Sequence, residues 1–388
     1  MSRPSGPRVT MLVRNPFTND TRVEREAASL ARAGYQVTVV AEAAEGLPRR
    51  EQTPSSTIIR VARPMRSVPG LRFVAFIIRL AMALVRTRPT ILHAHDTDAL
   101  QSVAPAAARL GIPFVYDAHE LWLGRSRRGR SWLYDRLARL YFGAIERLAI
   151  PRAAAVIVAN PAVGPELERR YGLRDVQPVP NYPVEVDPPQ PLQLRDLPGG
   201  DLIPSDVPLV LYSGGIAPDR GIEQLVEAMV EIPDAHLAFM GRGGLEPAIR
   251  ELVARFGLGR RVHFLGMVPS DEVVPYAASA TVGVLSTVPT CLNNVLALPN
   301  KIFQYMAAGI PVVASDYPQI RDIVVGSGAG VVMDPTDPSS IAAALRQVLA
   351  DRAEAQAVGQ RGQAAIRDSY HWSVAERTLL DVYGKVAA

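Results

Sequence analysis

The chain has 388 residues, which suits two domains, since a single core stops growing at about 250 residues. Hydrophobic residues make up 48% and charged residues 21%, and Cys291 is the only cysteine, so a disulfide framework and a cysteine-based metal site are excluded. The N-terminus lacks an apolar run of signal-peptide length because Arg14 interrupts it. We therefore expect a protein of the reducing cytoplasm.

The net charge of +4 hides an uneven distribution, because the half up to residue 188 is basic and the remainder is acidic. Every basic residue except Lys301 and Lys385 is an arginine, so part of this excess is compositional. A basic half suits nucleic acid, an anionic membrane surface or a phosphorylated substrate. Nucleic acid is disfavoured, because aromatic residues are only 6% and no zinc-finger spacing is present.

Short β-branched runs alternate with amphipathic segments of helical length along the first half. The helical segments 23–33 and 133–150 end at Gly34 and Pro151. Apolar strands separated by helices predict a parallel sheet that is covered on both faces. The expected strands of this half span residues 9–13, 37–41, 91–95, 114–118 and 155–159.

The second half repeats this pattern, with expected strands at 209–213, 236–240, 262–266, 281–285 and 311–315. Recurring prolines in residues 182–208 are incompatible with a helix interior and with a central strand, and they predict a linker. The expected fold class is α/β, with two doubly wound, Rossmann-like domains (1–181 and 209–371) facing a cleft. A last helix at about 372–388 is expected to pack back on the first domain. Such sheets bind ligands at the carboxyl ends of their strands.

Segment 71–85 is apolar, but it is too short to span a bilayer and contains Arg79. Its flanks carry arginines and no acidic residue. Two interpretations stay open: a helix packed on the sheet, which we favour, and an amphipathic helix at a membrane interface. The arginine-rich loop 124–132 has matching alternatives, a solvated loop or a contact with lipid or with the phosphate of an acceptor.

The polar segment 14–26 follows the first expected strand. It lacks the GxGxxG fingerprint, so a standard NAD site is not expected. Asn19 and Asp20 are expected to cap the next helix. Arg22 at the head of that helix opposes the helix dipole, which favours an anionic ligand nearby.

Two further polar clusters follow strands of the first half. Asp96 and Asp98 are expected to cap a helix, because two carboxylates without a third ligand make a poor metal site. Asp117, His119 and Glu120 follow the next strand. His119 is a candidate hydrogen-bond donor or acid and base near neutral pH, with an ordinary loop histidine as the alternative.

The second half carries the strongest chemical signal. Gly214 and Gly215 allow close approach of the backbone after a strand, and Arg220 lies at the head of the next helix. Lys301 lies in the first turn of another helix, where free amides and an ammonium can face a diphosphate together. Three glycine turns and two cations in one domain therefore predict a site for phosphate groups.

Four segments resemble a known family in order and over nearly the whole chain. The bacterial family 4 retaining glycosyltransferases of the GT-B fold are similar in NPFTNDTRVEREAASLARAGYQVTVVA, VYDAHELW, LYSGGIAPDRGIEQLVEAM and LPNKIFQYMAAGIPVVASDYPQIRDIV. The resemblance implies transfer of a sugar from a nucleoside diphosphate donor, most often a UDP-sugar, with retained anomeric configuration. It also implies a donor on the second domain, an acceptor on the first and no metal.

The resemblance further implies roles for single residues. His119 would lie beside the reacting sugar, and Arg220 and Lys301 would hold the diphosphate. Gln304 would face the ribose, while 241–243 and 265–268 would flank the base. The other donor positions would be Ser213, Gly214, Gly215, Gly241, Arg242, Gly243, Leu265, Met267, Val268, Pro299 and Asn300, and the acceptor side would hold Asn15, Phe17, Arg22, Asp96, Asp117 and Glu120.

Some positions depart from the family pattern. Two glutamates eight positions apart correspond to Leu296 and Gln304, and an arginine beside the first glycine is replaced by Gly215. A catalytically silent partner subunit and a UDP-sugar epimerase are therefore kept as alternatives. We expect no permanently bound cofactor and no nucleic acid partner. The acceptor classes considered are lipid-linked, cell-surface glycan and secondary-metabolite hydroxyls, with peripheral contact to the inner membrane face as an alternative to a purely cytoplasmic enzyme.

Overall fold

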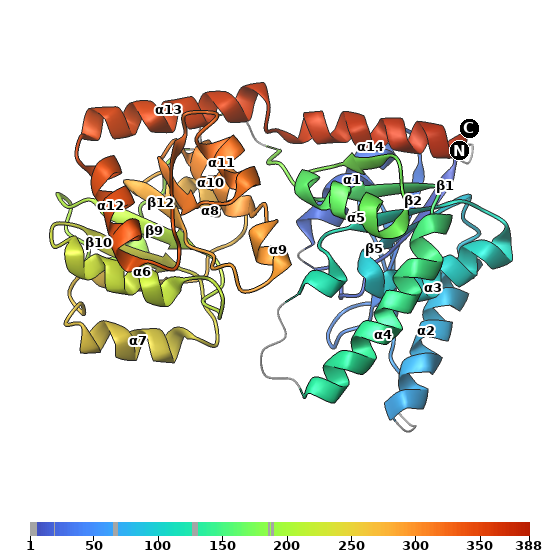
Figure 1. The fold of residues 1–388 in the computed structure, drawn as a ribbon. Helices are drawn as coiled ribbons and strands as arrows, with labels where there is room; N and C mark the ends of the chain where they lie inside the picture. Colours follow the sequence, from blue (N-terminus) through green and yellow to red (C-terminus); the bar gives the residue numbers. More distant parts are fainter. Residues whose placement is uncertain (1–5, 19, 65–68, 126–130, 185–186, 188–189) are drawn as a thin grey trace. The chain divides into compact units, whose positions relative to one another are not determined.

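The computed structural model describes residues 6–18, 20–64, 69–125, 131–184, 187 and 190–388. It divides into two compact units, shown in Figure 1: unit 1 is Met1–Asn181 with Ser373–Ala388, and unit 2 is Tyr182–Trp372. The expected cap Asn19, loop residues 126–130 and residues 185–186 and 188–189 of the proline-rich segment lie outside the described residues. The described part of segment 182–208 belongs to unit 2.

The strands of unit 1 form one eight-stranded sheet. They are β1 (Arg8–Leu12), β2 (Gln36–Glu42), β3 (Arg50–Gln52), β4 (Thr57–Val61), β5 (Ile91–His95), β6 (Phe114–Ala118), β7 (Ala155–Val158) and β8 (Val176–Pro178). Their order is β3-β4-β2-β1-β5-β6-β7-β8, and every neighbouring pair is parallel except β3 with β4. The direction of winding therefore reverses between β1 and β5.

Unit 2 has a six-stranded parallel sheet in the order β11-β10-β9-β12-β13-β14. Its strands are β9 (Leu209–Ser213), β10 (His236–Met240), β11 (Val262–Gly266), β12 (Val282–Leu285), β13 (Val312–Ser315) and β14 (Gly330–Met333). The winding reverses between β9 and β12. Because crossovers between parallel strands are right-handed, this reversal places helices on both faces of each sheet. The expectation of two doubly wound α/β units is confirmed.

Helices alternate with the strands in both units. Unit 1 contains α1 (Thr21–Arg32), α2 (Pro69–Arg86), α3 (Asp96–Leu110), α4 (Trp132–Ala149), α5 (Gly164–Tyr171) and most of α14 (Trp372–Ala387). Unit 2 contains α6 (Ile222–Ala228), α7 (Glu246–Arg255), α8 (Val273–Ala277), α9 (Leu292–Val295), α10 (Asn300–Ala308), α11 (Pro318–Val324), α12 (Pro338–Leu349) and α13 (Arg352–Asp368). Short 3₁₀ turns lie at Trp122–Gly124, Ile150–Arg152, Pro161–Val163, Leu194–Asp196 and Met229–Glu231.

All ten expected strands are present, and four others were not predicted: β3, β4, β8 and β14. Strand β4 reads TIIRV, and its buried Arg60 interrupts the apolar pattern. The guanidinium of Arg60 donates to the backbone oxygens of Pro16 and Pro48 and pairs with Glu51 at 2.7 Å. These partners come from other parts of the chain, so the sequence of the strand alone gives no sign of them.

Helix capping follows the prediction at one site and not at another. Asp20 is the N-cap of α1, and its side chain accepts a hydrogen bond from the amide of Val23. The expected capping by Asp96 and Asp98 is wrong, because His95 occupies the N-cap of α3 and makes no side-chain cap. Asp96 instead has a φ of 64° and accepts a hydrogen bond from the amide of His119 at 3.1 Å.

The C-terminal helix α14 packs on unit 1, as Figure 1 shows. The ring of Tyr383 lies edge-on to Tyr35, with centroids 5.6 Å apart, and its hydroxyl is 2.7 Å from Nδ1 of His93. Glu376 forms an ion pair with Arg32 of α1. The last residues of the chain therefore complete the core of the unit that contains its first strand.

Segment 71–85 forms the greater part of α2, whose Phe76, Leu80 and Leu84 are buried. The interpretation as a helix packed on the domain is therefore correct for one face of α2. Among the described residues, no helix combines the length and the hydropathy that a bilayer crossing requires.

A close contact in the core of unit 2 supports the end of β9. The hydroxyl of Tyr305 is 2.8 Å from the donating amide of Ser213. The Tyr305 ring lies against β12 at Gly283, where an added Cβ would come within 2.3 Å of the ring. Only glycine at position 283 therefore leaves room for this ring.

We expect Gly283→Ala to lower the free energy of unfolding by at least ~1–3 kcal/mol, because overpacking a closed core forces the ring or the strand to move. Thermal unfolding measures the effect. Gly259→Ala is the matched control, since an added Cβ there meets nothing within 4 Å. Equal melting temperatures of the two variants would contradict the described packing.

Candidate functional site

The first part of the candidate site lies where the strand order of unit 2 reverses. Parallel sheets bind ligands beyond the carboxyl ends of the strands at this point, because the adjacent loops diverge there. The carboxyl ends of β9 and β12 are followed by Gly214 and Ser286. Strand β9 is buried along its whole length, whereas Gly214 and Gly215 are exposed.

Backbone contacts hold two glycine turns together at this edge. The amide of Gly214, with a φ of 117°, donates to the oxygen of Met240 at 2.8 Å. A Cβ added at Gly241 would lie 2.0 Å from the Gly214 oxygen, and one added at Gly243 would lie 2.0 Å from the Ile216 oxygen. Glycine is therefore required for this approach, and the predicted segments 213–215 and 241–243 are brought together.

Lys301 lies in the first turn of α10, beside the first glycine turn. Its ammonium is 3.9 Å from the ring centre of Tyr212, which is cation–π geometry. A Cβ at Gly214 would lie 3.3 Å from Nζ, so this glycine leaves space for the ammonium. The N-cap position of α10 is Pro299, which provides no side-chain cap, so the first amides of the helix keep their capacity to bind an anion.

Burial and the charge of Arg220 lower the pKa of Lys301 to about 7. The guanidinium of Arg220 also lowers the pKa of Tyr212, whose ring lies under the ammonium, although burial raises that pKa by more. The charge of Arg220, which is exposed in the turn before α6, therefore acts at the position of the Lys301 ammonium. In the described part of the chain neither Lys301 nor Arg220 forms an ion pair with a carboxylate. Two like charges without an internal anion favour a ligand anion at this position.

A groove of about 400 Å³ lies on the β10–β11 side of unit 2. It brings together Arg242, Leu265 and Met267, three predicted base-flanking residues. Val268, predicted with them, is half-buried and is not among the lining residues. The groove is also lined by Leu197, Pro198, Glu246, Arg250, Phe264 and Gly266, which were not predicted.

Arg250 stacks on Phe264 in this groove, with its guanidinium 4.0 Å from the ring centre. It also pairs with Glu246 one helical turn earlier. The (i,i+4) spacing of Glu246 and Arg250 in α7 is typical of any solvated helix, so the sequence does not indicate that they line the groove. Gln304, predicted to face the ribose, is half-buried in α10 next to Tyr305.

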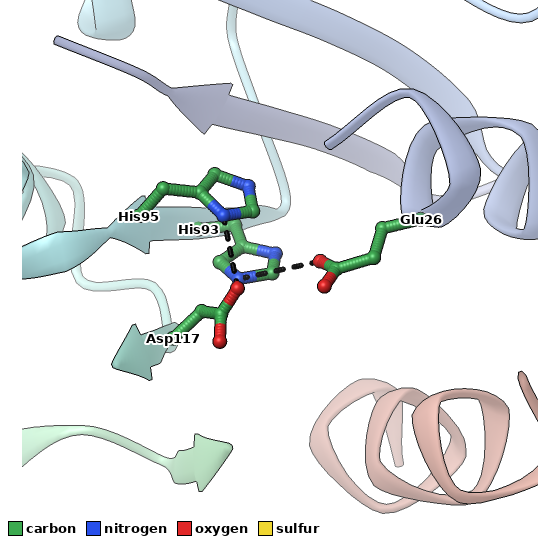
Figure 2. Close-up of side chains that lie close together, drawn as sticks. All are labelled: Glu26, His93, His95 and Asp117. Atoms are coloured by element: carbon green, nitrogen blue, oxygen red, sulfur yellow. Dashed lines mark hydrogen bonds and ion pairs between the residues drawn. The ribbon is translucent and has the colours of Figure 1, made fainter. Parts of the chain in front are cut away.

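The second part of the candidate site is a polar cluster in unit 1, where the strand order reverses between β1 and β5. Figure 2 shows four of its side chains, Glu26, His93, His95 and Asp117, pointing toward one another from α1, β5 and β6. All four are buried. Asp117 lies 3.1 Å from Nδ1 of His95 and 3.0 Å from Nε2 of His119.

Arg22 supplies the positive charge of this cluster. Its guanidinium donates two hydrogen bonds to Asp117, at 2.8 and 2.7 Å, and lies 3.2 Å from Glu26. Burial alone would raise the pKa of Asp117, but Arg22 and the histidines hold it well below its usual range. The expectation that Arg22 faces a ligand anion is thus corrected, because its anion is a carboxylate of the chain itself.

The four buried side chains place their ligand atoms within 4.8 Å of one another, which is compatible with a metal ion. Arg22, however, already provides the cation that Asp117 and Glu26 require. Burial and the charge of Asp117 raise the pKa of Glu26 to about 8, so this carboxyl is mostly protonated at neutral pH. A protonated carboxyl and a bound guanidinium fit a resident metal poorly.

His119 is the member of the cluster that reaches solvent, with its side chain 25% exposed. Burial lowers its pKa, but Asp96 and Asp117 outweigh that effect and raise it to about 9. Its ring is therefore an imidazolium at neutral pH. Nε2 is engaged by Asp117, whereas Nδ1 lies at a longer 3.5 Å from Asp96. Nδ1–H is thus the group best able to donate to a ligand hydroxyl.

The remaining predicted residues of unit 1 shape the surroundings of this cluster. Asn15 donates to Asp20 and accepts from the amide of Phe17, which is buried with a φ of 55°. Glu120 pairs with Arg125 at 2.7 Å. His93 and His95, which complete the cluster, were not predicted, because buried strand residues are read first as core.

Two protein families match the chain in succession. Residues 20–182 match the family described as Glycosyltransferase Family 4, and residues 207–351 match the family described as Glycosyl transferases group 1. The chain is 25% identical to 2-deoxystreptamine glucosyltransferase of Streptomyces kanamyceticus, with 90% of this chain and 94% of that protein covered. It spans about half the length, 46% and 49%, of two other curated relatives that it matches.

Solved structures resemble the whole chain. Sucrose-phosphate synthase from Thermosynechococcus elongatus superposes with a TM-score of 0.78 at 21% identity, covering 98% of this chain and 99% of that one. HepE of Anabaena in complex with UDP-glucose gives a TM-score of 0.73 at 15% identity, covering 97% and 99%. At these identities the likeness establishes a shared fold.

We expect Asp96→Asn to lower the pKa of His119 from about 9, because one of the two carboxylates that raise it becomes neutral. Asparagine tolerates the positive φ at this position, so the turn is retained. Titration of the His119 ring protons by NMR measures the shift. Asp135→Asn, on α4, is the control and leaves the His119 titration unchanged.

We expect Lys301→Met to raise the melting temperature most below pH 7. Because the pKa of Lys301 is lowered in the folded state, the unfolded chain binds the proton more tightly and wild-type stability rises between pH 7 and about 10.5. The gain of the variant should shrink over this range. Thermal unfolding at several pH values is the measurement, with the exposed Lys385→Met as control. A gain independent of pH would argue against the buried ammonium.

Proposed function

Since the chain belongs to the family 4 glycosyltransferases and has the GT-B fold, we propose that it transfers a sugar from a nucleoside diphosphate donor to a hydroxyl acceptor. In this proposal unit 2 binds the donor and unit 1 binds the acceptor. The observation that carries it is the ammonium of Lys301, held on the Tyr212 ring beside the glycine turn at Gly214, without a carboxylate partner among the described residues.

The proposed chemistry follows from the charges at this edge. Cleavage of a glycosyl phosphate bond places negative charge on the departing diphosphate. Lys301 and the first amides of α10 are held where they can stabilise that charge, and Arg220 adds a second cation from the exposed turn before α6. A metal ion has this role in other enzymes. We therefore propose metal-independent transfer.

We further propose that the anomeric configuration is retained. The departing phosphate oxygen can accept the proton of the attacking hydroxyl on the same face of the sugar, so no protein nucleophile is needed. The buried carboxylates of unit 1 support this proposal, because Asp117 and Glu26 are buried against Arg22 and are not placed to attack a ligand.

For the donor we favour a UDP-sugar. The groove near Arg242 and Met267 is lined by apolar side chains, by arginines and by Glu246, which pairs with Arg250, and the apolar and aromatic part of this lining suits a base. HepE, which shares the fold, has been solved with UDP-glucose. The protonated His119 of unit 1 is proposed to donate a hydrogen bond to a sugar hydroxyl, and it would not act as a base at neutral pH.

For the acceptor we propose a hydroxyl of a lipid-linked glycan, a cell-surface glycan or a secondary metabolite. One relative is named 2-deoxystreptamine glucosyltransferase, and an acceptor of that kind belongs to the last of these classes. We propose a cytoplasmic location with peripheral contact to the membrane through the basic unit 1.

We expect Arg220→Ala and Lys301→Ala each to reduce turnover of a UDP-sugar by at least ~100-fold, because each removes a charge that stabilises the transition state. Donor hydrolysis and then transfer to a panel of acceptors are the assays, run with and without EDTA. Circular dichroism shows that the fold is kept, and UDP should raise the melting temperature of the wild type more than that of either variant.

Arg260→Ala is the control, since Arg260 is an exposed arginine of the same unit outside both parts of the site. Near-normal rates in both site variants would refute the assignment. Binding of UDP without hydrolysis or transfer would identify a silent partner subunit, and a change in the sugar without acceptor would identify an epimerase.

A further inference from the structure

Two helices of unit 1 that both pack against α3, namely α2 and α4, expose an unusual number of large apolar side chains. Most large hydrophobic residues of the described chain that face solvent lie on these two helices. We call this surface the α2–α4 face. Its members are Leu71, Phe73, Val74, Ile78 and Met82 of α2, and Trp132, Leu133, Tyr134, Leu137, Leu140, Tyr141 and Leu148 of α4.

The two halves of the α2–α4 face meet at an aromatic contact. Phe73 of α2 and Tyr141 of α4 pack edge to face, with ring centroids 6.1 Å apart, and α3 packs against both helices, whose places in unit 1 Figure 1 shows. On α2 the buried Phe76, Leu80 and Leu84 occupy the side opposite Leu71, Val74, Ile78 and Met82, so these four are not a partly open core, whereas Phe73 lies on the buried side and contacts Tyr141. A patch of this extent on a water-soluble domain marks an interaction surface.

Arginines border the apolar residues. Arg72, Arg79 and Arg86 recur every seven residues, which places them along one flank of α2. Arg136, Arg139 and Arg147 are exposed on α4. The acidic residues of α4 are Asp135, which pairs with Arg139 at 2.9 Å, and the buried Glu146, while α2 contains no acidic residue. The α2–α4 face therefore has a strong net positive charge.

A groove of about 690 Å³ runs between the arginine flank of α2 and strand β4. Its lining includes the exposed Arg49, Arg50, Arg79 and Arg86 and contains no carboxylate. Within the described ranges none of these four arginines forms an ion pair. Three threonines, at 38, 57 and 87, add hydroxyl groups to the lining. Arg79 donates one hydrogen bond to the backbone oxygen of Ala62, and the four guanidinium groups keep further N–H donors for phosphate oxygens.

We infer that the α2–α4 face docks on a bilayer that carries anionic headgroups, with its apolar side chains in the interface and the arginine groove against the lipid phosphates. Trp132 and Tyr134 suit this location, since aromatic side chains favour the headgroup region. The apolar surface and the cations contribute together to such binding. The inference specifies the partner of the peripheral contact in the proposed function, and it does not depend on the identity of the donor.

A second copy of the chain fits the same face less well. In a symmetric dimer the face would meet itself, so the arginines would oppose the same arginines of the other copy. Opposed like charges at an interface are unfavourable. An anionic lipid surface instead complements both the apolar residues and the arginines.

The test is flotation of the full-length protein with vesicles of phosphatidylcholine alone and with equal parts of phosphatidylcholine and phosphatidylglycerol. We expect binding to the anionic vesicles and little to the neutral ones. The double variant Arg50→Gln, Arg86→Gln should bind the anionic vesicles about 30-fold more weakly, because a cation at such a surface contributes about 1 kcal/mol, or about fivefold. Leu133→Gln with Leu137→Gln should also weaken binding.

The matched controls are Leu202→Gln and Arg260→Gln, exposed residues of unit 2, and they should bind as the wild type does. Equal binding by all variants, or none by the wild type, would overturn the inference. So would a dimer in sedimentation experiments that the Leu133 and Leu137 changes dissociate. UDP-sugar hydrolysis measured on the same preparations reports on the proposed function separately, since none of these residues lies in either part of the candidate site.

Discussion

The candidate site depends on one electrostatic constraint: the ammonium of Lys301 is held against Tyr212, within the influence of the charge of Arg220, without an internal counter-ion in the described part of the chain. Burial and mutual repulsion lower the stability of this arrangement, and the fold accepts it because α10 and the glycine turn at Gly214 fix the ammonium against Tyr212. The opposite solution occurs in unit 1, where Arg22 is neutralised by Asp117. Lys301 and Arg220 can therefore bind an incoming anion, whereas Arg22 and Asp117 already neutralise each other and stabilise the interior of unit 1.

Most of the architecture follows from the sequence because both sheets are parallel and buried. Strands such as β9 and β10 read as continuous apolar runs, and Gly or Pro punctuates the helices between them. The strands that were missed are short or lie toward an edge of their sheet, as β3, β8 and β14 do. There, pairing is decided by distant partners, as it is for the buried Arg60 of β4.

The sequence also predicts which loops carry the chemistry, because strand ends in parallel sheets meet at one edge. It does not predict which side chains at that edge become hydrogen-bond or ion-pair partners. Asp96 and Asp98 have the residue types of helix caps, yet Asp96 instead binds the amide of His119. Likewise Arg22 lies far from Asp117 in the chain, and only the arrangement of α1 beside β6 makes them partners. The local sequence pattern indicates which residues tend to cap helices. Which charged side chains pair depends on the distances between them in the folded chain.

The position of α14 has a consequence for how the chain is made. The first unit draws α14 from the part of the chain that follows the whole second unit, and the hydroxyl of Tyr383 in that helix lies 2.7 Å from Nδ1 of His93 in the middle of the sheet. During translation, residues 182–372 emerge before this helix exists, so the second unit can mature while the first still lacks a piece of its interior. Ribosomes that stop early would thus release a product with an exposed hydrophobic seam, which the quality-control machinery of the cell can recognise.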